Sequence, residues 1–191
     1  VAAGSIPASD LSPYIRRQIR LLGDSELGEQ VNLLEKTGGE RRTAREVMRA
    51  KYGEWVTSTA LQTADSAQGR TIFLNLCASC HTFRGEGGKI GPDLTGRTSD
   101  AILQKVVDPS AQISPDYRLS IARTKDGRTI AGVIAERTSR TITFRSLAET
   151  VTVATDDILG IETSAQSIMP EGLFESLSRT QVRDLVGYLV G

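Results

Sequence analysis

Apolar residues near the start of the chain recur at helical spacing and predict three helices. The first covers residues 12–22, with Ser12 as its N-cap and Pro13 at its first helical position. The second covers residues 24–37 and is expected to end at the Gly-Gly pair that follows. The third starts at a capping box in residues 43–46. We expect these helices to form a packing segment without chemistry of its own.

Three further helices are predicted along the chain. One leads into a pair of cysteines, and its face repeats at positions i, i+3, i+4 and i+7: Gly69, Ile72, Phe73 and Leu76. A short helix over residues 99–107 is stopped by Pro109. The last begins at a capping pair, Ser178 and Gln181, and carries one apolar face: Val182, Leu185, Val186 and Leu189.

Residues 114–164 alternate instead of repeating at helical spacing. Five short segments rich in Thr, Val and Ile predict five strands: YRLSIART, TIAGVIAER, TITFRS, TVTVA and DILGIET. The sequence KDGR, residues 125–128, predicts a tight turn between the first two. The strand count and this turn loosely resemble SH3-like or Sm-like barrels. We therefore expect a mainly α fold with a helical N-terminal extension and an inserted, barrel-like all-β subdomain of about five strands.

Composition adds few constraints. Apolar residues make up 39% and charged residues 24%, which describes an ordinary globular protein. Aromatic residues reach only 5%, so either a bulky apolar cofactor or a core of small residues is expected. The 23 basic and 23 acidic residues cancel, and no overall field favours nucleic acid. No apolar run approaches the roughly 18 residues of a membrane span. Because the chain begins at Val1 without a leader, we expect a processed protein or an excised piece.

Both cysteines and the only histidine lie in one pentapeptide, Cys77-Ala-Ser-Cys80-His81. A structural zinc site needs four ligands, and these residues give three. A dithiol redox motif usually lies at a helix N-terminus, whereas this one closes a helix. A structural disulfide is a third alternative. The fourth is covalent haem attachment, in which two thiols add to the porphyrin vinyl groups and the histidine ligates iron. The pentapeptide alone does not decide, because it also occurs by chance.

The surroundings of the pentapeptide resemble the small His/Met cytochromes c. In that family a glycine eight residues and an aromatic four residues before the first cysteine face the last helix, and Gly69 and Phe73 match them. Leu185 and Tyr188 match the apolar and aromatic pair of that last helix. Glycine permits a close helix crossing, and the rings fill the angle. The resemblance implies a cytochrome c fold built from these helices.

The sequence GPDL, residues 91–94, matches the Gly-Pro-x-Leu turn of the same family. The resemblance implies that Pro92 and Leu94 belong to the haem site. It also implies that the Pro92 carbonyl accepts the Nδ1 proton of His81, so that Nε2 faces iron.

The second axial ligand is expected to be Met169. The only histidine is used, which excludes two histidine ligands within one chain. Met48 lies inside a predicted helix, where methionine commonly fills a core. Met169 lies in a loop before the last helix, where the family places its ligand, and Pro170 restricts its conformation. Its distance in sequence from the histidine becomes ordinary for the family once residues 114–164 are removed. A lysine, a water or an open site are the alternatives.

Within the family the chain looks most like C-terminal haem-binding domains of large secreted proteins of planctomycetes and verrucomicrobia. GPDLTGR, VVDPSAQISPDY, KDGRTIAGVI and SIMPEGL carry this likeness. It implies a helical extension over residues 1–62, a haem domain over residues 63–113 and 165–191, and a β insertion over residues 114–164. Upstream domains of a parent protein are therefore expected.

The resemblance implies one covalent haem c and one-electron transfer by a protein that is not itself an enzyme. With His81 and Met169 both on iron, only the oxidation state can change. An open-site haem sensor, a peroxidase-like enzyme and a haem-stabilised interaction module are the alternatives. We expect a redox partner protein, no nucleic acid and no membrane span. Haem attachment follows export in most bacteria, so a periplasmic or otherwise extracytoplasmic location is expected. The β insertion would shield the haem edge or dock a partner.

Overall fold

The computed structural model describes residues 13–191, so the predicted N-cap Ser12 lies outside the described residues. The chain divides into two compact units, one up to residue 48 and one over residues 49–191. In the first unit, α1 (Pro13–Leu21) agrees with the first predicted helix. An ion pair of 4.0 Å joins Arg16 of α1 to Glu35 of α2 (Ser25–Trp55).

The second and third predicted helices form one continuous helix, α2, so the predicted break after residue 37 is wrong. A Cβ at Gly38 or Gly39 would have nothing within 4 Å, and neither glycine has a positive φ. Glycine inside a helix costs only about 1 kcal/mol relative to alanine. The predicted cap at Thr43 is also absent, because its hydroxyl donates to the carbonyl of Gly39 at 3.1 Å. Two glycines weaken this helix without ending it.

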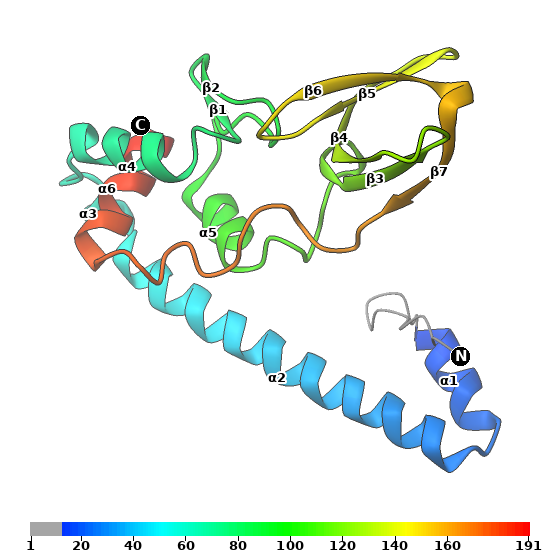
Figure 1. Ribbon diagram of the computed structural model, residues 1–191. Helices are drawn as coiled ribbons and strands as arrows, with labels where there is room; N and C mark the ends of the chain where they lie inside the picture. Colours follow the sequence, from blue (N-terminus) through cyan, green and yellow to red (C-terminus); the bar gives the residue numbers. More distant parts are fainter. Residues whose placement is uncertain (1–12) are drawn as a thin grey trace. The chain divides into compact units, whose positions relative to one another are not determined.

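Three helices of the second unit, α4, α5 and α6, begin and end close to the predicted residues, whereas the short helix α3 was not predicted. Asp65 caps the helix before the cysteines, Thr98 caps the next long one, and Ser178 forms the predicted capping box with Gln181. Figure 1 shows these helices in chain order: α3 (Ser58–Leu61), α4 (Ser66–Leu76), α5 (Ser99–Val107) and α6 (Arg179–Val190).

The helices α4 and α6 cross at Gly69, as the sequence predicts. A Cβ on Gly69 would run into the carbonyl oxygen of Asp184 and the Cβ of Tyr188. Beside this crossing, the ring of Tyr188 lies 5.9 Å from that of Phe73 and 5.0 Å from that of Phe83. A buried carboxylate also stabilises the crossing: Asp184 Oδ1 accepts a hydrogen bond from the backbone N–H of Asp65 at 3.0 Å. Close backbone approach and interlocked rings therefore hold the two helices together.

The end of α2 that belongs to the second unit carries an aromatic cluster that the periodicity did not reveal. Tyr52 is only 3% exposed, and its ring lies 5.2 Å from Trp55 and 5.3 Å from Phe174. Phe174 comes from the segment that leads into α6 and is equally buried. An ion pair of 2.6 Å between Arg49 and Asp100 adds a link to α5.

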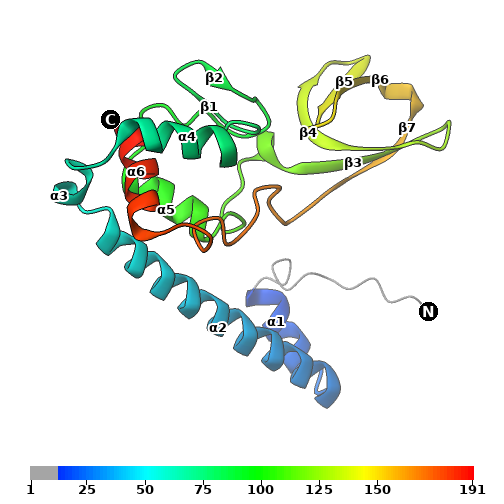
Figure 2. The ribbon, with the colours of Figure 1, turned by 60° about the vertical axis from the view of Figure 1, so that its left-hand side comes forward.

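The five predicted strands are confirmed and form one antiparallel sheet in the order β6-β5-β4-β3-β7. The sheet is curved, as a barrel-like subdomain requires, but it does not close into a barrel (Figure 2). Its two edges, β6 and β7, do not pair. Its apolar cluster is Ala122, Ile130, Ile142, Phe144 and Val153. The strands are β3 (Leu119–Thr124), β4 (Thr129–Arg137), β5 (Thr141–Arg145), β6 (Thr150–Ala154) and β7 (Ile158–Thr163). All lie within residues 114–164, although the proposed division into domains stays a prediction.

The predicted turn between β3 and β4 is present. Gly127 has a φ of 85°, which favours glycine, and the Thr124 amide donates to the carbonyl of Arg128 at 3.0 Å. Hydrogen bonds from the Thr124 hydroxyl and then from Arg128 lower the pKa of Asp126 to about 2. This turn aligns β3 with β4.

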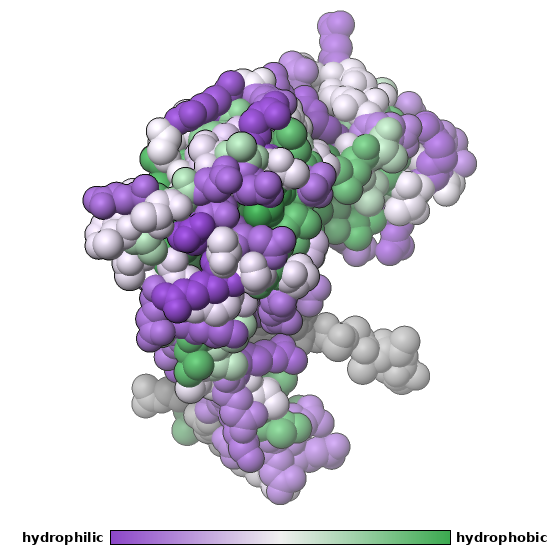
Figure 3. Space-filling model, turned by 90° about the vertical axis from the view of Figure 1, so that its left-hand side faces the viewer, coloured by the Kyte–Doolittle hydropathy of each residue, from purple (hydrophilic) through white to green (hydrophobic). Residues whose placement is uncertain are grey.

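The surface of the molecule is mixed in character. Hydrophilic residues predominate on the face drawn in Figure 3, and hydrophobic residues occur there in small groups. The most exposed large apolar side chains of the second unit are those of Leu147 and Leu159. Within residues 13–191, no helix is both long enough and apolar enough to cross a membrane.

Replacing Gly69 by alanine should destabilise the second unit by roughly 1–3 kcal/mol, because a methyl group is forced against the backbone of α6. Gly53→Ala is the matched control, since its Cβ would have open space in α2 and should stabilise by roughly 0.5–1 kcal/mol. Urea unfolding followed by the fluorescence of Trp55 measures both. Equal stability of the two variants would contradict the close crossing.

Candidate functional site

The Cys-x-x-Cys-His segment forms one tight turn at the end of α4. Cys77 is the C-cap of this helix, and its N–H donates to the carbonyl of Phe73 at 2.8 Å. The carbonyl of Cys77 then accepts the N–H groups of both Cys80 and His81, at 3.1 and 2.9 Å. The helix thus delivers two thiols and an imidazole on one fixed turn of backbone.

The motif carries two thiols, and that of Cys77 is not activated. Neither forms a disulfide within residues 13–191, and both are half-buried. Burial, with a smaller contribution from Cys80, raises the pKa of Cys77 to about 11. A dithiol redox centre needs the opposite shift, because the thiolate is its nucleophile. Among the described residues, no three His, Cys, Asp or Glu side chains are grouped to hold a metal ion.

His81 is held by the carbonyl of Pro92, as the sequence predicts. The distance from Nδ1 to this oxygen is 2.8 Å. A carbonyl can only accept, so Nδ1 carries the proton and Nε2 keeps the lone pair. The backbone of Gly91 lies against the face of the ring, where a Cβ would approach Nδ1 to 2.7 Å and Nε2 to 2.9 Å. This arrangement fixes both the tautomer and the orientation of the imidazole, which suits a metal ligand.

A glycine-rich loop that includes residues 88–91 lies on the turn, and backbone hydrogen bonds hold it there. It follows the short hairpin of β1 (Thr82–Phe83) and β2 (Glu86–Gly87). Three of its amides donate to the motif: Gly88 to the carbonyl of Ala78 at 2.7 Å, and Ile90 and Gly91 to the carbonyl of Cys80 at 3.0 and 2.8 Å. A Cβ on Gly88 would collide with the carbonyl of Ser79. The glycines therefore let this loop lie directly on the motif's own backbone.

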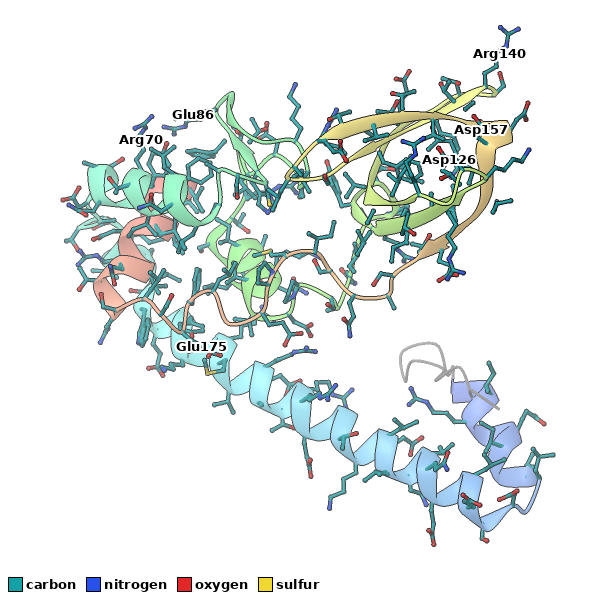
Figure 4. All side chains as sticks on the ribbon, in the orientation of Figure 1. Arg70, Glu86, Asp126, Arg140, Asp157 and Glu175 are labelled. Atoms are coloured by element: carbon teal, nitrogen blue, oxygen red, sulfur yellow. The ribbon has the colours of Figure 1, made fainter. Side chains whose placement is uncertain are left out.

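One side-chain bond and one further backbone bond hold the same loop. The hydroxyl of Thr82 donates to the carbonyl of Gly88 at 2.7 Å, and the Thr82 carbonyl accepts the amide of Leu94 at 2.8 Å. Leu94 is half-buried. Arg70 of α4 reaches both carboxylate oxygens of Glu86, at 2.7 and 2.8 Å, and ties the hairpin to the helix (Figure 4).

Met169 lies in the segment between β7 and α6 and is half-buried. Its amide donates to the hydroxyl of Ser167 at 3.1 Å, and the amide of Ser167 donates to the hydroxyl of Ser110 at 3.1 Å. Ser110 follows α5, so this pair of serines ties the methionine segment to the first half of the helical region. This link could not be predicted from the sequence, because two serines far apart in the chain form no recognisable pattern. Met48, the other methionine, is a half-buried residue of α2.

Residues 66–129 match the family model of cytochrome c. The match supports a c-type cytochrome. It covers α4, the motif, the glycine-rich loop and α5, and it ends at the start of β4, so Met169 and α6 lie outside it. No curated protein matches the chain. Members of this family are mostly electron carriers, typically extracytoplasmic, and the family implies covalently bound haem c with its iron.

The residues of the turn suit that cofactor. Two unpaired thiols are three positions apart on a fixed turn, and the histidine that follows keeps the lone pair of Nε2 available. Cys77, Cys80 and His81 could therefore hold the porphyrin and its iron, with Pro92 as the partner of the imidazole.

Gly91→Ala should displace the imidazole of His81, because the new methyl group would occupy the space of the ring. Under reducing conditions, the ¹⁵N spectrum of His81 should lose its single Nδ1-protonated form. The assignment is unambiguous because the chain has one histidine. Gly160→Ala in β7, where a Cβ meets nothing within 4 Å, should leave the spectrum unchanged. An unaltered His81 spectrum in Gly91→Ala would show that the ring is not held at this position.

Proposed function

We propose that the protein binds one haem c through Cys77 and Cys80 and transfers single electrons with His81 and Met169 as the axial ligands. The observation that carries the proposal is the state of His81. Its Nδ1–H donates a hydrogen bond to the carbonyl of Pro92, so Nε2 keeps a lone pair that can bind iron. His81 directly follows Cys80, and both cysteines of the motif are unpaired. The cytochrome c match over the same residues supports this assignment.

Each residue has a separate task in this proposal. Bound haem supplies a one-electron couple between ferric and ferrous iron. The hydrogen bond to the Pro92 carbonyl makes the His81 imidazole a stronger electron donor to iron and keeps its ring from turning. The thioether of Met169 favours ferrous iron and raises the potential relative to a second histidine. Pro92 and Leu94 line the histidine side of the site.

Met169 is supported by its surroundings and by elimination. Its amide is anchored to Ser167, which is anchored in turn to Ser110, so the methionine lies on a fastened segment. Pro170 restricts the backbone from the other side. His81 is the only histidine of the chain, so no second imidazole competes for iron. With both positions filled, the protein would act as an electron carrier and not as an enzyme.

The setting of this carrier is also part of the proposal. The partner would be another redox protein, reached from a periplasmic or otherwise extracytoplasmic location, where haem is attached after export. The likeness to haem-binding domains of secreted planctomycete and verrucomicrobial proteins favours a module of a larger protein. In that arrangement residues 1–62 form the extension, residues 63–113 and 165–191 the haem domain, and residues 114–164 the inserted sheet.

Haem attachment is tested by producing the chain in a host that matures c-type cytochromes. The purified protein should exceed its polypeptide mass of 20.6 kDa by one haem, and the haem should survive denaturation. Cys77→Ala and Cys80→Ala should each leave one thioether bond, and the double variant should release the haem on denaturation. Ser79→Ala, in the same turn, is the control and should keep the full covalent attachment. A colourless protein of polypeptide mass would refute the proposal.

Axial ligation is tested by replacing each methionine. Met169→Ala should abolish the weak far-red absorption band that ferric iron shows with a sulfur ligand, and it should open the reduced iron to carbon monoxide. Met48→Ala should keep the band and exclude carbon monoxide. The reverse result would assign the ligand to Met48. Fast and complete carbon monoxide binding by the unaltered protein would instead favour an open-site sensor.

A further inference from the structure

One hydrogen bond joins the five-stranded sheet to the loop that holds His81. Nη1 of Arg145, the last residue of β5, donates to the carbonyl oxygen of Lys89 at 3.1 Å. Arg145 is half-buried, and its backbone is fixed by pairing with Val133 on one side and Thr150 on the other. Figure 1 shows this end of the β5–β6 hairpin beside the loop that follows β2.

The carbonyl that Arg145 binds is half of a peptide group whose other half is bound to the haem motif. The C=O of Lys89 and the N–H of Ile90 belong to one rigid plane. That N–H donates to the carbonyl of Cys80 at 3.0 Å. The Cys80 carbonyl shares its own plane with the N–H of His81, which donates to Cys77 at 2.9 Å. Two peptide planes thus connect the guanidinium of the sheet to the axial histidine.

A charged hydrogen-bond donor at one end of a series of hydrogen-bonded peptide groups strengthens the other hydrogen bonds in the series. The guanidinium polarises the Lys89 carbonyl, and polarised peptide groups make better donors at their opposite end. The next two residues along the loop are Gly91, which lies against the imidazole, and Pro92, which accepts its proton. Fixing the peptide between residues 89 and 90 therefore fixes the segment that orients His81.

A close approach of β4 and β5 accompanies the position of Arg145 beside the loop. Gly132 precedes Val133, the β4 partner of Arg145, and a Cβ on Gly132 would collide with the carbonyl oxygen of Arg145 and lie 2.9 Å from its carbonyl carbon. Glycine is needed for this close approach of two strands, although its φ is not positive. The final residue of β5 can therefore lie close against β4, with its side chain directed to the loop.

We propose that Arg145 is a positioning residue for the axial histidine, acting through the Lys89–Ile90 peptide. The sheet would then set the geometry of the haem ligand and not merely cover it. This inference rests on the proposed function, because only a bound haem makes the orientation of His81 matter for the redox potential.

The test compares Arg145→Ala with Arg140→Ala on the haem-loaded protein. Arg140 lies at the far tip of the β4–β5 hairpin and points away from the sheet, so its loss removes the same charge without touching the loop (Figure 4). Hydrogen exchange of the Ile90 amide should become about fivefold faster in Arg145→Ala, as expected for losing one hydrogen bond. It should be unchanged in Arg140→Ala and largely restored in Arg145→Lys, which keeps a charged donor.

The midpoint potential is the second measurement, because a merely structural contact would not move it. A weaker hydrogen bond between His81 and Pro92 makes the imidazole a weaker electron donor to iron, which favours the ferrous state. The midpoint potential of Arg145→Ala should therefore shift upward. The comparison is made at about 0.5 M salt, where the direct effect of removing a surface cation is largely screened. Arg140→Ala should keep the potential of the unaltered protein.

The outcomes separate this inference from the proposed function. If haem attaches in every variant but the Ile90 exchange and the potential of Arg145→Ala are unchanged, the positioning role fails and the cytochrome assignment stands. Faster exchange without a shift in potential also overturns the role, as does an equal response in Arg140→Ala. If the unaltered protein attaches no haem, the proposed function fails, and the role of Arg145 fails with it.

Discussion

The site depends on the hydrogen bond from the Nδ1 proton of His81 to the carbonyl of Pro92. An imidazole can bind a metal through either nitrogen, and the acceptor that holds the proton of one nitrogen decides that the other is free. Pro92 can serve because Gly91 before it leaves space for the ring. The loop, its glycines and its amide bonds to Cys80 are all arranged so that this carbonyl faces this nitrogen.

That arrangement needs a rigid platform, which the crossing of α4 and α6 provides. Gly69 brings the two backbones into contact, and Phe73, Phe83 and Tyr188 form an interlocked set of rings beside it. The motif begins where α4 ends, so the direction of that helix sets the direction of the thiols. The Arg70–Glu86 pair fastens the hairpin of the loop to the same helix.

Sequence periodicity predicted the elements but not their long-range pairings. The strands and the capped helices were correct because alternation, caps and tight turns are local properties. The break predicted at Gly38 was wrong because the local cost of glycine is small against the cooperativity of a long helix. Closure of the barrel could not be inferred, since it depends on whether two edge strands meet. The contacts of Arg145 and Ser167 could not be predicted either, because they join common residue types that lie far apart in the sequence.

The sheet lies between the two proposed iron ligands along the chain, yet it does not need to strain either one. The chain leaves the helical region after α5 and returns before Met169, and these two points are tied together by Ser110 and Ser167 at 3.1 Å. A second bond closes the base of the sheet, where the amide of Ser164 donates to the carbonyl of Leu119 at 2.8 Å. Because entry and exit are adjacent, the methionine segment starts from a fixed point whatever the length between them. A β segment joined in this way can carry its own contact to the histidine loop without loosening the segment that holds Met169.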